Sequence, residues 1–333
     1  INLYVRRIFI LDDAKYLMPS YLRFVRGVVD AADLPLNVSR EFLQNNKDID
    51  RIRTASVKKI LNELKRIAEN NPESYVQFWR EFGKVLKEGM VEDHENQKTL
   101  AELLRFCTTH DDEEAQTVSL ANYVKRMPMK QKGIYFITAD SYAAASTSPH
   151  LEIFRKNDIE VLLLTDPVDE WLVTSLSDYE EKPLKSIAKG TLDLDEFATD
   201  DQKKAAEEKG KDLTGLVEKI QAVLSDRVKE VRVSHRLTDS PACLVADDHD
   251  LGGNLERILQ SMGQDAPDAK PIMEINADHP LIKQLAPEHE RLEEWSMVLF
   301  DQAALSEGAR LSEPAAYVKR VNDLLTRASL LTT

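Results

Sequence analysis

The segments Gly133-Ile134-Tyr135-Phe136-Ile137-Thr138 and Ile159-Glu160-Val161-Leu162-Leu163-Leu164 are short apolar runs, each long enough for one buried strand. Helical patterns precede, separate and follow them, at Leu120–Met127, Tyr142–Phe154 and Pro167–Leu176. Strands that alternate with helices in this way form parallel sheets. Residues 118–195 are therefore predicted to form a small α/β unit.

A helical pattern precedes this unit. Between Val57 and Ala68 the apolar residues recur at helical spacing, and Asn70-Asn71-Pro72 ends the stretch. Two further apolar helical stretches follow before residue 118. Residues 47–117 are therefore predicted to be a three-helix segment.

The first 46 residues mix strand and helix signals. The alternation of Leu3, Val5, Ile8 and Ile10 predicts a buried strand. A helical pattern follows it. We expect residues 1–46 to be the end of a larger α/β unit.

Residues 196–333 mix helix and strand patterns and are predicted to form an α+β domain, so the whole chain belongs to the α/β (α+β) class. Its last two predicted helices, near 291–305 and 314–329, carry apolar stripes that need a partner surface. The stripes include Leu292, Trp295, Val298, Leu299, Val318, Val321, Leu324 and Leu325.

Composition excludes several classes of partner. The 333 residues contain 44 Lys and Arg against 58 Asp and Glu, a net charge of −14. Such a charge repels nucleic acid and anionic lipid, so we expect neither as a partner. No apolar run is long enough to span a membrane. Cys107 and Cys243 are far apart in sequence, which favours reduced thiols and a cytoplasmic location.

The sequence contains none of the common catalytic motifs. Phosphate loops of the Walker type, GxGxxG, HExxH and GxSxG are all missing, and the seven histidines show no metal-ligand spacing. We therefore predict no metal site. The run Asp247-Asp248-His249-Asp250 lacks the spacing of a calcium loop and is interpreted as a solvated turn.

The segment from Asp33 to Gln44 offers one candidate for anion binding. Ser39 is a good N-cap, so Arg40 would project from a loop-to-helix junction that already favours negative charge. This placement suits an arginine that contacts phosphate. On residue chemistry alone, an ordinary surface ion pair is the favoured alternative.

Several strings resemble the heat-shock protein 90 chaperone family. They include Leu3–Asp13, Arg26–Asp30, Asp33–Gln44, Tyr135–Asp140, Ser148–Glu152 and Val161–Trp171. The likeness covers essentially the whole chain, and the C-terminal third is similar to the bacterial form. It implies a middle domain at 1–195 and a C-terminal dimerisation domain at 196–333. Because the chain starts at Ile1 inside a strand pattern, we expect a fragment whose nucleotide-binding domain lies upstream.

The resemblance also implies roles for individual residues. Arg40 matches the arginine that reaches the ATP γ-phosphate in the full-length protein, with Asn37 and Gln44 in the same loop. ATP and Mg²⁺ are then cofactors of the full-length ATPase, while the fragment has no cofactor and no expected activity of its own.

Client contacts are implied at two places. Trp171, next to Glu170, matches a tryptophan that touches substrate proteins, although a core position is equally compatible with its sequence. A second set matches a helix exposed to clients, although without the family its stripe would be interpreted as core: Leu251, Leu255, Ile258, Leu259 and Met262.

The leading hypothesis is a chaperone fragment that dimerises through its last two helices and binds partly folded clients. Chaperones of the heat-shock protein 70 system are further expected partners. A structural interaction scaffold without direct client binding is the alternative, and a small-molecule enzyme is disfavoured by the missing catalytic motifs.

Overall fold

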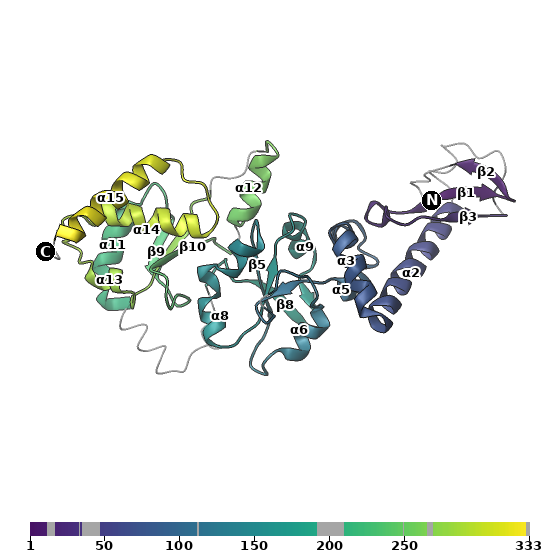
Figure 1. Ribbon diagram of the computed structural model, residues 1–333, viewed down its shortest axis with the longest axis horizontal. Coiled ribbons are helices and arrows are strands. Elements are labelled where there is room, and N and C mark those ends of the chain that lie inside the picture. The colour runs from purple at the N-terminus through teal and green to yellow at the C-terminus, as the bar shows by residue number, and fades with distance from the viewer. Residues whose placement is uncertain are drawn as a thin grey trace. The chain divides into compact units, whose positions relative to one another are not determined.

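The computed structural model describes residues 1–11, 17–32, 34, 47–111, 113–191, 210–248, 250–264 and 269–330. The chain forms two compact units that are interleaved in sequence. The N-terminal unit contains residues 1–107, 115–126 and 168–181, and the C-terminal unit contains residues 108–114, 127–167 and 182–333. Helices and strands are mixed in both (Figure 1), which confirms the predicted α/β (α+β) class.

The N-terminal unit begins with a small sheet of order β2-β1-β3. Its strands are β1 (Asn2–Val5), β2 (Ile8–Leu11) and β3 (Val28–Asp30). β1 pairs antiparallel with β2 and parallel with β3. Leu3 and Val5 are fully buried and form a core with residues such as Leu17 and Ile49.

The prediction of one strand from Leu3 to Ile10 is wrong, because the chain reverses at Arg6 and Arg7. Both have left-handed φ angles, 50° and 65°. Two-residue hairpin turns favour such angles but usually use Asn or Gly. The apolar alternation continued across the turn and hid it, and Ile8 is in fact 53% exposed.

A helical segment follows, with one single-turn helix more than the three helices predicted. It consists of α2 (Lys47–Asn70), α3 (Pro72–Lys87), the single turn α4 (Gly89–Glu92) and α5 (Gln97–Leu103). The side chain of Asn71 accepts a hydrogen bond from the Ser74 backbone N–H at 3.2 Å, which caps α3 directly after α2 ends. The unit is completed by η2 (Ser20–Leu22), α6 (Leu120–Arg126), α9 (Asp169–Ser175) and β7 (Asp178–Tyr179).

The predicted parallel layer is confirmed in the C-terminal unit. β5 (Ile134–Thr138) lies between β6 (Val161–Leu164) and β8 (Lys182–Ser186) and is parallel to both. The single helix predicted over Tyr142–Phe154 is wrong. Because Ser148 and Pro149 interrupt it, three short helices form instead: α7 (Tyr142–Ser146), η3 (Pro149–Leu151) and α8 (Glu152–Lys156).

A second sheet lies in the same unit, with order β10-β11-β9. Its strands are β9 (Glu230–Val233), β10 (Ala242–Val245) and β11 (Ile272–Ile275). Apolar side chains from α11 (Thr214–Val223) and α14 (Leu292–Ser306) share one core with this sheet. The remaining helices are α12 (Gly253–Ser261), α13 (Pro280–Gln284) and α15 (Pro314–Leu330).

The predicted boundary between residues 195 and 196 lies outside the described residues and stays a prediction. The compact units group residues 127–167 with the C-terminal part of the chain. β4 (Cys107–Thr108) lies where the chain passes from one unit into the other.

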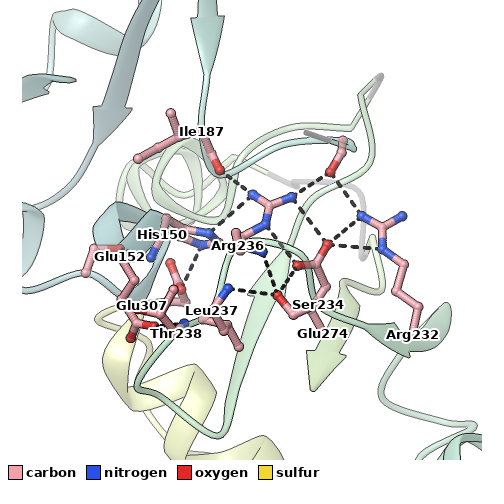
Figure 2. A network of polar contacts seen from close by, with 12 residues as sticks. His150, Glu152, Ile187, Arg232, Ser234, Arg236, Leu237, Thr238, Glu274 and Glu307 are labelled. Atoms are coloured by element: carbon pink, nitrogen blue, oxygen red, sulfur yellow. Dashed lines mark hydrogen bonds and ion pairs between the residues drawn. The ribbon is translucent and has the colours of Figure 1, made fainter. Parts of the chain in front are cut away.

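Figure 2 shows a network of buried charges that ties the two sheets of the C-terminal unit together. Arg236 is 1% exposed, and its Nε donates to Glu274 Oε2 at 2.9 Å. The other guanidinium N–H groups donate to the carbonyl oxygens of Ile187 and Gly190, which follow β8. Arg232 Nη2 also donates to Glu274, at 2.8 Å to Oε1. A residue after β9 is thereby bonded to the strand β11 and to the end of β8.

Two other side chains strengthen this link. The Glu152 carboxylate of α8 accepts hydrogen bonds from the backbone N–H groups of Thr238, Asp239 and Ser240, at 2.6–3.0 Å. The buried His150 lies with its Nε2 2.9 Å from Glu307 Oε1, at the end of α14. Arg236 can only donate, so Nδ1 of His150 is the acceptor in their contact at 3.5 Å.

The Glu274 carboxylate is kept charged by these neighbours. Burial by itself raises the pKa of Glu274, but the positive charges of Arg236 and Arg232 and their hydrogen bonds outweigh it, so the pKa is lowered. A group whose pKa is lowered by folding stabilises the folded state above its ordinary pKa of 4.5, and that contribution is lost as the pH falls below it.

We predict that Glu274→Gln lowers the free energy of unfolding by about 3–5 kcal/mol at neutral pH, since it leaves a buried guanidinium without its counter-charge. Urea denaturation of the chain measures this loss. The difference between variant and wild type should shrink as the pH is lowered below 4.5.

The matched control is Asp278→Asn, which removes the carboxylate of an exposed ion pair with Lys283 in the same unit. Its cost should stay within about 1 kcal/mol. Equal losses in the two variants would contradict the role assigned to Glu274.

Candidate functional site

Trp171 lies in the middle of the two-turn helix α9 of the N-terminal unit. Asp169 and Leu172, three residues apart on one face of this helix, are fully buried. A helix advances 100° per residue, so Trp171 lies about 130° around the axis from the midpoint of Asp169 and Leu172, away from that buried face. Its side chain is half-buried. The position is therefore neither the closed core site nor a fully exposed one, and part of the indole can be reached from solvent.

Glu170, the other expected contact residue of α9, is only 6% exposed. Its carboxylate thus contributes little surface of its own. Of the two expected contact residues on this helix, Trp171 is the one that offers an accessible apolar surface.

The apolar stripe around α12 is not a closed core. Leu251, Leu255, Ile258 and Leu259 are each half-buried, and Met262 is 63% exposed. In Figure 1 this helix stands out from the β9–β11 sheet instead of covering it. Arg257 on α12 forms an ion pair with Asp140 at 3.2 Å, which fixes the helix beside the end of β5. An accessible apolar stripe is what the resemblance implied.

A cavity of about 170 Å³ lies beside the start of α12 in the C-terminal unit. Its walls carry the cations Lys189, Arg257 and Lys270 and the carboxylates Asp250, Glu256 and Glu307. Charges of both signs line it, so it shows no preference for an anionic or a cationic ligand.

The eight apolar residues assigned to an interface fall into two groups. Leu292, Val298, Leu299 and Leu324 are buried inside one chain, and Trp295 packs against the core of the β9–β11 sheet. Val321 is half-buried, whereas Val318 and Leu325 are 54% and 63% exposed. Most of the α14 stripe is thus packed inside the chain, and its part in a dimer stays a prediction. Of these eight residues, the exposed ones, Val318 and Leu325, lie on α15.

Arg40, Asn37 and Gln44 lie outside the described residues, so the γ-phosphate contact stays a prediction. Within the described ranges, no group of three or more His, Cys, Asp and Glu residues could hold a metal ion. Among the helices described, none is long and apolar enough to cross a membrane. Burial raises the pKa of the Cys243 thiol well above its ordinary value, which disfavours the reactive thiolate.

The buried charges were not predicted from the sequence. Lys87 and Asp169 form an ion pair in the N-terminal unit in which both side chains are 1% exposed. One signal was present in the sequence: Lys87 continues the four-residue spacing of Tyr75, Trp79 and Gly83, which are buried on one face of α3. A lysine at a core-facing helix position requires a buried partner.

Comparisons with known proteins agree with this architecture. A family model described as Hsp90 protein matches residues 1–331. The protein named Chaperone protein HtpG from Nitrosomonas europaea is 55% identical over 329 residues, covering 98% of this chain and 51% of the relative. The proteins of the same name from Dechloromonas aromatica and Nitrosococcus oceani are 54% and 56% identical, covering 99% and 98% of this chain and 52% of each relative.

The chain spans about half the length of the curated relatives it matches. The likeness is far above the level at which only the fold is shared, and it runs through both compact units. The resemblance to the heat-shock protein 90 family is thereby confirmed. This chain belongs to the Hsp90 protein family.

Proposed function

We propose that this chain is the part of an ATP-driven chaperone that binds partly folded client proteins and dimerises. One observation carries the proposal: in a chain that matches relatives named as chaperones, Trp171 and the stripe of α12 are left accessible. Tryptophan and flexible aliphatic side chains offer large contact areas to partners without a fixed sequence. The scaffold alternative assigns no direct role to these surfaces.

Assembly of two copies through α15 is part of the same proposal. Val318 and Leu325 expose more than half of their apolar side chains on the last described helix. A second copy supplies the same surface, and an isologous interface would cover both. α14 supports α15 from inside the chain, since Asp301 on α14 lies 3.4 Å from Arg320 on α15.

ATP hydrolysis would belong to the longer protein. Arg40, with Asn37 and Gln44 in the same loop, would bring a fixed cation to the γ-phosphate of Mg²⁺-bound ATP held by another domain. The chain by itself supplies no nucleotide site in this proposal.

The cellular setting follows from the same proposal. Cys107 and Cys243 are buried thiols, as is usual in a reducing compartment, which supports a cytoplasmic location. The net charge of −14 disfavours nucleic acid and anionic membranes as partners. Chaperones of the heat-shock protein 70 system are proposed partners on family resemblance.

We predict that Trp171→Ala weakens binding of the chain to an unfolded test protein about tenfold, because it removes a large apolar contact surface. Fluorescence anisotropy with a labelled, permanently unfolded polypeptide measures the affinity. The matched control is Phe82→Ala, which removes an aromatic side chain that is 38% exposed on α3 of the same unit. Unchanged affinity in Trp171→Ala, or equal losses in both variants, would favour the scaffold alternative.

For assembly, Val318→Asp combined with Leu325→Asp should convert a dimer into a monomer, since two carboxylates per chain would be buried in the interface. Sedimentation velocity at micromolar concentration gives the oligomeric state. Ile8→Asp combined with Val28→Asp is the control, because it changes two exposed apolar residues in the other unit. A wild type that sediments as a monomer would refute assembly through α15.

In the longer protein, Arg40→Ala should lower kcat for ATP hydrolysis by about 10³ while nucleotide affinity changes little, as for other arginines that act on the transferring phosphoryl group. Steady-state kinetics and nucleotide titration separate the two effects. Arg26→Ala, at an exposed position in the same unit, is the control. Equal losses of affinity and turnover would make Arg40 a ground-state binder.

A further inference from the structure

Lys87 and Asp169 form a buried ion pair next to the residue proposed to contact clients. Lys87 Nζ lies 2.8 Å from Asp169 Oδ1 and 3.1 Å from Oδ2. The ammonium also lies 5.3 Å from the centre of the Phe106 ring, within the range of a cation–π contact. The two residues are 82 positions apart in sequence, and the second is two residues before Trp171.

The charges fit the ends of the helices that carry them. Lys87 is the last residue of α3, and Asp169 is the first residue of α9. A cation is stabilised at a helix C-terminus and an anion at a helix N-terminus. The pair therefore joins the negative end of α3 to the positive end of α9 with the favourable sign at both.

α9 is too short to hold its orientation without tertiary contacts. It contains seven residues, and its N-cap residue Val168 makes no side-chain capping bond. A helix of this length is marginal without tertiary contacts. Its buried side chains are Asp169, Glu170 and Leu172; Leu172 packs without directional preference, and the two oxygens of Asp169 face one ammonium. The ion pair is thus a directional contact that restrains the rotation of α9 about its axis.

We propose that Lys87 is a positioning residue for client binding: through Asp169 it fixes the rotation of α9 and so presents the indole of Trp171 at the surface. This inference rests on the proposed client-binding function. Removing the pair takes away a directional contact between α9 and the end of α3. Trp171 then loses its fixed orientation. Client binding must then order this side chain, at a cost in free energy that does not arise in the wild type.

The test uses the whole chain and the double variant Lys87→Met with Asp169→Leu. Replacing both buried charges with apolar side chains of similar size avoids an unpaired charge, so the melting temperature should remain within a few degrees of wild type. Affinity for reduced, carboxymethylated α-lactalbumin, an unfolded polypeptide, should fall about tenfold, as for Trp171→Ala. Amide hydrogens of α9 should exchange faster, while those of α2 should be unchanged.

A double-mutant cycle distinguishes positioning from a general loss of stability. If the pair acts through Trp171, adding Trp171→Ala to the double variant should cost less than twofold more affinity, because the two changes remove the same contact. A purely structural role gives additive losses. Additivity would overturn the inference.

The matched control is Lys65→Met with Glu102→Leu, which removes an exposed lysine–carboxylate pair of the same unit, at 2.5 Å. It should leave affinity unchanged, and an equal loss there would overturn the inference. Should Lys87→Met with Asp169→Leu fail to fold, Asp169→Asn keeps the shape of the side chain and should give a smaller loss of affinity in the same cycle.

The outcomes also separate this inference from the function on which it rests. Unchanged affinity in Trp171→Ala would refute client binding through this residue. A tenfold loss in Trp171→Ala together with wild-type affinity in the Lys87→Met, Asp169→Leu variant would refute the positioning role alone.

Discussion

The guanidinium of Arg236 lies inside the C-terminal unit, where a charge must be neutralised by its neighbours. Glu274 supplies the counter-charge, and carbonyl oxygens after β8 accept the remaining N–H groups. Because these partners come from separate elements, the charge is satisfied only when β9, β11 and the end of β8 are assembled together. An apolar contact could be replaced by many similar ones, but this arrangement has few alternatives. It makes the two sheets depend on each other.

Packing in the C-terminal unit also decides which apolar surfaces are buried and which are exposed. α14 contributes its stripe to the core of the β9–β11 sheet, and α15 lies on the outer side with Val318 and Leu325 exposed. α12 is covered on part of its circumference only. The apolar surfaces available to a partner are therefore those that the core does not bury. They lie on α12 and α15, and each of these helices packs against other elements of the unit.

Apolar runs and helical spacing were sufficient to predict β5, β6 and the helices α2, α3 and α5, because each of these elements buries a continuous face. The hairpin at Arg6 and Arg7 could not be predicted, since two arginines carry no turn signal and the alternation of β1 continues into β2. The stripes of α14 and α15 look alike in sequence. Which one faces the core depends on sheets more than fifteen residues away in sequence, information that periodicity does not contain. For the candidate site, the family resemblance identified Trp171, but the pairing of Lys87 with Asp169 depends on a contact across 82 positions.

The interleaving of the two units has a consequence for synthesis on the ribosome. Residues 168–181 complete the N-terminal unit, yet they are made after residues 127–167, which belong to the C-terminal unit. Domains that are continuous in sequence can fold one after another as they emerge. This chain cannot, because its first unit remains unfinished until part of the second has left the exit tunnel. α9, which carries Trp171, is among the last parts of the N-terminal unit to be synthesised. A nascent chain therefore gains this surface only after most of that unit has been made.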